Sequence, residues 1–78
     1  MFSEMENQIL KVLGKKALMI AEITEKCYPK KNKPINANNT VAGTIRRINM
    51  KCKAHNLKWK IEGYGTGRGG RIVWIKEI

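Results

Sequence analysis

The spacing of hydrophobic residues changes once along this chain, near residue 57, and the change restricts the folds that the chain can adopt. Before it, apolar residues recur every three or four positions, which is typical of amphipathic helices. After it, Leu57, Trp59 and Ile61 alternate with charged residues, which is typical of a half-buried strand. Helices are therefore expected first and strands last. With 78 residues there is room for one domain, residues 1–78, of the α+β class.

Two short helices are expected in the first third of the chain. Ser3 and Glu6 have the spacing of a capping box, and Gly14 offers a C-terminal stop, so the first helix spans residues 4–13. The segment "ALMIAEITEKCY", residues 17–28, carries the apolar stripe of the second helix, which Pro29 closes.

A third helix is expected over residues 38–54, and its side chains divide into two sets. The asparagines just before it are expected to cap its start. One narrow stripe is apolar and predicts a side packed on the core: Val41, Ile45, Ile48 and Cys52. The far side is basic and polar: Asn39, Gly43, Arg46, Arg47, Met50 and Lys53.

The last part of the chain predicts a β-hairpin. Residues 57–64 and the run "RIVWIKEI", residues 71–78, have strand-forming composition, and a glycine-rich segment separates them. An isolated hairpin is marginal in water, so its Trp59 and Ile61 side is expected to pack on the helices. A short extended segment at residues 17–19 could add a third strand. Three helices followed by a C-terminal hairpin describe a winged helix-turn-helix.

Positive charge is concentrated in the later part of the chain. Residues 1–26 hold four lysines and four glutamates, so the whole net charge of +10 falls from Cys27 onward. This segregation predicts a surface for a polyanion, whereas a merely solubilising charge would be spread evenly. Cys27 and Cys52 lie in apolar patterns and are expected to be reduced and buried. Cys52 and His55 offer too few ligands for a metal site.

The glycine-rich segment allows three interpretations. A nucleotide-phosphate loop would lead into a helix and carry a GK(S/T) motif, whereas this segment leads into a strand and lacks one. A bare hairpin tip would need no ligand. A DNA-contacting wing over residues 63–71 is favoured, because Arg68 and Arg71 suit phosphates and the minor groove.

The far side of the third helix is interpreted as a DNA-reading surface. Asn39, Thr40 and the two arginines are residue types that reach base edges or phosphates. Gly43 removes a side chain that would hold the backbone away from a groove. A basic exposed face is also common in helices that bind nothing, but its combination with a basic wing favours DNA.

The run "NNTVAGTIRRINMK" resembles the recognition helix of winged-helix transcription regulators, particularly the effector domains of bacterial response regulators. The residues that carry the resemblance are Val41, Ile45, Arg46, Arg47, Ile48 and Lys51. The segment "WKIEGYGTGRGGRIVWI" is loosely similar to the hairpin of that family. The resemblance implies that the third helix reads DNA and that the loop from Arg68 to Arg71 is the wing.

The function expected from these patterns is a small DNA-binding protein, most simply a transcription regulator of phage or plasmid type. It needs no cofactor and is no enzyme, because no nucleophile has a base at a meaningful spacing. No membrane span or secretory signal is present, so a cytoplasmic location is expected. The predicted DNA contacts are Asn39, Thr40, Gly43, Arg46, Arg47, Met50, Lys51, Lys53, Arg68 and Arg71, with Lys30, Lys31, Lys33, Lys58 and Lys60 attracting phosphates.

Three other functions stay open at this stage. One is an architectural or recombination-directing factor of the excisionase kind. Another is a protein-interaction module that holds a partner through the first helix, or a homodimer. The third is RNA binding, which is disfavoured because Trp59 and Trp74 are expected in the core or hairpin and not on an exposed stacking platform.

Overall fold

The computed structural model describes residues 1–28, 34–65 and 71–78. The elements follow in the order α1 (Glu4–Leu13), β1 (Leu18–Met19), α2 (Ile20–Cys27), α3 (Ala37–Ala54), β2 (Trp59–Gly65) and β3 (Arg71–Glu77). The expected α+β class is confirmed, with three helices and an antiparallel three-stranded sheet in the described residues. None of these helices is long and apolar enough to cross a membrane.

Helix α1 begins and ends where local signals predict. The Ser3 amide donates to Glu6 Oε1 at 2.7 Å, and the Glu6 amide donates to Ser3 Oγ at 3.2 Å, which completes the capping box. Gly14 ends the helix with φ of 51°, a conformation that glycine adopts at little cost, and its amide donates to the Leu10 carbonyl.

Helix α2 starts only at Ile20, because Leu18 and Met19 pair with β3 instead of extending the helix. The expected extended segment is therefore confirmed at its last two residues. The helix ends at Cys27, and the Tyr28 amide donates to the Thr24 carbonyl. Pro29, the predicted stop, lies outside the described residues.

Helix α3 spans Ala37–Ala54, one residue longer than expected at its start. An asparagine, Asn36, is the N-cap residue, as expected, but it does not cap the helix through its side chain. The Asn36 side chain makes no cap hydrogen bond, and its backbone carbonyl instead accepts from the Thr40 amide and hydroxyl at 2.9 and 3.1 Å. The Thr40 hydroxyl and the Thr40 amide thus share one acceptor, the Asn36 carbonyl oxygen.

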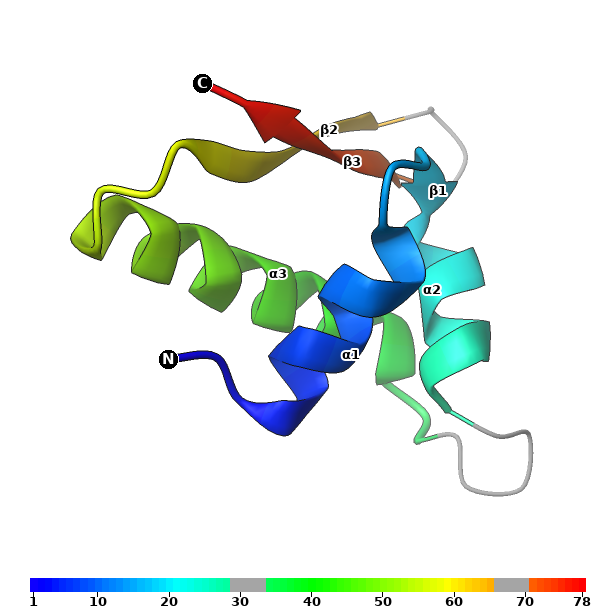
Figure 1. The fold of residues 1–78 in the computed structure, drawn as a ribbon. Coiled ribbons are helices and arrows are strands. Elements are labelled where there is room, and N and C mark those ends of the chain that lie inside the picture. The colour runs from blue at the N-terminus through cyan, green and yellow to red at the C-terminus, as the bar shows by residue number, and fades with distance from the viewer. Residues whose placement is uncertain (29–33, 66–70) are drawn as a thin grey trace.

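The sheet has the strand order β1-β3-β2, with both pairings antiparallel. Leu18 pairs with Val73, and Ile61 pairs with Ile75, so the last strand in the chain is the central one. All three helices lie on one side of this sheet (Figure 1).

The core lies between the helices and the covered face of the sheet. Ile9, Ile23, Val41, Ile48 and Val73 are almost fully buried there. Half-buried Trp59 packs against this cluster, as predicted, and stacks at a tilt on Phe2 with ring centroids 5.8 Å apart. Burial of these side chains supplies most of the stability of so small a chain.

Both cysteines are free and buried, as expected. Burial raises the pKa of the Cys27 and Cys52 thiols, because a thiolate would lose its hydration. They therefore stay protonated near neutral pH and act as small apolar side chains.

Candidate nucleic-acid interface

The two predicted sides of α3 are separated in the structure. Val41, Ile45 and Ile48 are buried, and the polar residues on the far side are exposed. Gly43 lies on the same side and is half-buried. We call this surface the α3 outer face, and it consists of Asn39, Thr40, Gly43, Arg46, Arg47, Met50 and Lys53.

Positive charge on the α3 outer face is not neutralised within the described part of the chain. Helix α3 holds no acidic residue. No ion pair involves Arg46, Arg47 or Lys53 in residues 1–28, 34–65 and 71–78. Three cations on one face without counter-charges produce a positive potential that favours a polyanion.

The middle of this face is unusually open. A Cβ atom built on Gly43 would meet nothing within 4 Å, so the helix backbone is directly accessible there. Met50, two turns further along the same side of the helix, is 66% exposed and offers an apolar, adaptable contact among the cations. The surface therefore combines charge, an accessible backbone and one apolar group.

Lys51 does not belong to this face, although the sequence placed it among the DNA contacts. Its ammonium pairs with Glu6 of α1 at 2.6 Å and lies 5.8 Å from the centre of the Phe2 ring. Glu6 is only 2% exposed, and burial alone would raise the pKa of its carboxyl group. The hydrogen bond from Lys51 outweighs this effect and holds the pKa below the ordinary range. Lys51 thus joins α3 to α1, and its charge is already compensated.

Asn49 is a structural residue that the sequence analysis missed. Its side-chain amide donates to the Ile61 carbonyl, and its carbonyl oxygen accepts from the Ile61 amide, both at 2.8 Å. The side chain thereby completes the backbone hydrogen bonding of β2, an edge strand, and fixes the hairpin on α3. Asparagine in mid-helix was the available signal, but its partner could be found only in the fold.

Arg71 begins β3 opposite Gly65 and is exposed. Side chains alternate along a strand, so Arg71 lies on the same side of the hairpin as Val73, which is the side that faces the helices. Arg71 and the α3 outer face therefore belong to the helical side of the sheet. The predicted contacts Arg68, Lys30, Lys31 and Lys33 lie outside the described residues.

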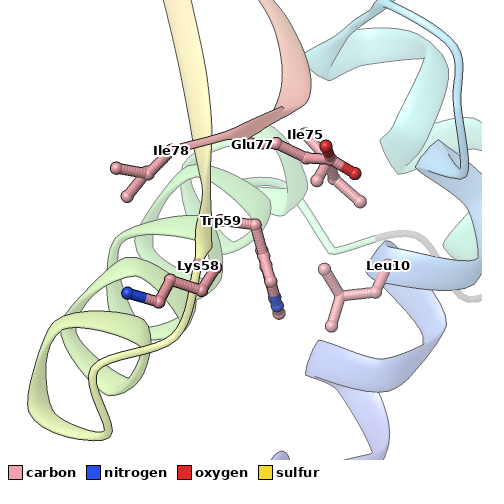
Figure 2. A pocket seen from close by; sticks show the side chains of 6 residues that line it. All are labelled: Leu10, Lys58, Trp59, Ile75, Glu77 and Ile78. Atoms are coloured by element: carbon pink, nitrogen blue, oxygen red, sulfur yellow. The ribbon is translucent and has the colours of Figure 1, made fainter.

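Lys58 and Lys60, expected to attract phosphate, lie just before and within β2 and are not part of the α3 outer face. Lys60 lies 3.9 Å from Glu62 on the hairpin. Lys58 lines an open hollow of about 580 Å³ at the open end of the hairpin, together with Leu10 of α1 and Trp59 of β2 (Figure 2). Its lining is mainly apolar, and its charged residues are Lys58 and Glu77.

Among the described residues, no three His, Cys, Asp or Glu side chains gather where they could hold a metal ion. His55 forms the C-cap of α3, where its amide donates to the Lys51 carbonyl at 2.9 Å.

Comparison with known proteins gave no further guide: no family description, curated protein sequence or solved structure matches this chain significantly.

Proposed function

We propose that this chain is a winged helix-turn-helix protein that binds double-stranded DNA. The order α1-β1-α2-α3-β2-β3, with the hairpin antiparallel to a short strand after the first helix, supports that fold. In such a protein α3 enters the major groove, and the hairpin loop lies on the minor groove or the backbone. The observation that carries the proposal is the α3 outer face, where three cations lie around an accessible glycine and have no ionic partner among the described residues.

The exposed side chains match the contacts that duplex DNA offers. The Arg46 and Arg47 guanidinium groups present forks that suit phosphates and the O6 and N7 atoms of guanine. Asn39, near the helix start, suits adenine, and Met50 suits a thymine methyl group. Gly43 allows the helix axis to approach the groove.

Duplex DNA is favoured over duplex RNA because of groove shape. The major groove of B-form DNA admits an α-helix, whereas that of A-form RNA is deep and too narrow for side chains to read. The role proposed for the binding is regulation of transcription. A large bend in the bound DNA would instead indicate the architectural role.

A salt titration tests the proposal. Fluorescence anisotropy with a labelled duplex of about two helical turns would measure affinity from low to moderate salt. If about six phosphates are neutralised, log affinity should fall against log salt with a slope of roughly −5. A flat titration would contradict the proposal.

A matched pair of double variants locates the surface. Arg46→Ala with Arg47→Ala removes two charges from the α3 outer face, and the slope should become shallower by roughly two units. Lys15→Ala with Lys16→Ala removes the same charge from the exposed segment after α1, and its effect should be much smaller. Equal losses in the two variants would show that only net charge matters.

A further inference from the structure

The sheet has a second face that no helix covers (Figure 1). Neighbouring residues of a strand alternate between faces, and paired residues of two strands share a face. Because Ile61 and Val73 are buried toward the helices, the residues next to them lie on the open side. We call this surface the outer sheet face, and it consists of Met19, Lys60, Glu62, Tyr64, Ile72, Trp74 and Lys76.

An aromatic pair lies on the outer sheet face, toward the loop end of the hairpin. The Tyr64 and Trp74 rings meet edge to face, with centroids 5.9 Å apart and planes at 72°. Tyr64 is 59% exposed. Trp74 lies in the hairpin, which is one of the two places expected for it, and is half-buried. The strand register directs it away from the core, whereas Trp59 packs inward.

The backbone beneath these rings is closely packed. A Cβ atom at Gly63 would lie 2.7 Å from both the Ile72 carbonyl oxygen and Val73 Cγ1. Only glycine fits there, so β2 and β3 approach closely next to Tyr64. The ring is therefore presented from a well-defined strand pair and needs little ordering on binding.

The charges around the aromatic pair favour an anionic partner. Glu62 lies 3.3 Å from the Lys76 ammonium and 3.9 Å from that of Lys60. One carboxylate between two lysines leaves this face positive. A second copy of the chain would bring lysines against lysines, in a protein with a net charge of +10.

We propose that the outer sheet face binds single-stranded DNA, with Tyr64 and Trp74 stacking on unpaired bases. Aromatic rings beside cations are the combination that single-stranded nucleic acids require, because every base has a flat apolar face and every linkage a charge. Lys60 and Lys76 follow the phosphates. The choice of DNA over RNA rests on the proposed duplex binding. The proposal that this face stacks on unpaired bases does not depend on it.

Binding of a labelled oligothymidine of about ten nucleotides tests the inference. Tyr64→Leu, which keeps an apolar side chain but removes the ring, should weaken this binding by roughly 5- to 150-fold, and Tyr64→Phe should retain it. The same affinity for all three proteins, or an equal loss in both variants, would overturn the proposal. Tighter binding of oligouridine by the unchanged protein would overturn the choice of DNA.

The duplex probe separates this site from the α3 outer face. Tyr64 lies at the start of the proposed 63–71 wing, so Tyr64→Leu should weaken duplex binding far less than it weakens oligothymidine binding, and the Arg46 and Arg47 double variant should keep most of its affinity for oligothymidine. Binding of oligothymidine without binding of duplex would refute the proposed function and leave this site standing. Binding of duplex without oligothymidine would refute this site alone.

Tryptophan fluorescence gives a readout that does not depend on a Tyr64 variant. Trp59→Phe leaves Trp74 as the sole indole, and oligothymidine should quench its emission on stacking. Unchanged emission at saturating oligothymidine would overturn the proposal.

Discussion

Helix α3 carries similar polar residues on its outer face and on its two flanks, which lie between that face and the core and hold Lys51 and Asn49, but their surroundings differ. Arg47 and Lys51 are neighbours one turn apart, but Lys51 is paired with buried Glu6 and Arg47 has no ionic partner in the described part of the chain. On the opposite flank, Asn49 is committed to Ile61. The comparison shows that residue type alone does not distinguish a structural side chain from one available to a ligand. A side chain is structural where a neighbouring element supplies a partner for it, as α1 does for Lys51 and β2 does for Asn49.

The largest effect is expected from Asn49→Ala. The variant leaves the Ile61 amide and carbonyl without their partners, so the free energy of unfolding should fall by about 2–4 kcal/mol. Arg46→Ala, on the outer face of the same helix, should change it by less than about 0.5 kcal/mol. Urea denaturation followed by circular dichroism measures both. Similar values for the two variants would remove the distinction between flank and face.

Lys51→Met should have the next largest effect on stability. It leaves the Glu6 carboxylate buried without its cation, and the free energy of unfolding should fall by about 1–3 kcal/mol, moderated by the half-exposed position of the lysine. Arg47→Met is the matched control and should leave stability nearly unchanged but weaken duplex binding. A larger loss of DNA affinity for Lys51→Met, measured on protein that is still folded, would return Lys51 to the DNA contacts.

Acid should weaken the same ion pair. The pKa of Glu6 is lower in the folded chain than in the unfolded one, chiefly because of Lys51, so the unfolded state takes up a proton first as the pH falls. The stabilisation is complete above the ordinary pKa of a glutamate, which applies to the unfolded chain, and is lost as the pH drops through the lower pKa of the folded chain. Unfolding curves of Glu6→Gln should depend less on pH in this range. An unchanged pH dependence would show that other carboxyl groups dominate.

The smallest effect is expected from Gly43→Ala, which should raise stability slightly and lower duplex affinity. Alanine in the middle of a helix should raise the free energy of unfolding by about 0.5–1 kcal/mol, because nothing obstructs the added methyl group. Duplex affinity should fall if the backbone approaches the groove at this position. Thermal unfolding and anisotropy on one preparation measure both. A more stable variant with undiminished affinity would indicate that Gly43 lies away from the DNA.

Much of the fold could be predicted because its signals are local. The capping box of Ser3 and Glu6, the stop at Gly14 and the alternation from Trp59 onward each involve residues close in sequence. The same reasoning separated the buried and exposed sides of α3, because helical periodicity alone determines which residues share a side.

The contacts that hold the elements together could not be predicted in this way. Glu6 and Lys51 come from the first and third helices, and no local pattern shows that a lysine one helical turn after Arg47 has an internal partner. Trp74 was expected in the core or the hairpin, but its face depends on the strand register. A shift of register by one residue would have reversed its direction.

The position of β3 has a consequence for how the molecule is made. This strand comes last along the described chain, yet it separates β1 from β2 and pairs with both. While the protein emerges from the ribosome, α1 and α2 can form, but β1 has no neighbour until Ile72 and Val73 arrive. Completion of the sheet therefore waits until β3 has been synthesised, and a nascent chain cut short before Arg71 would leave its helices without the layer they pack against.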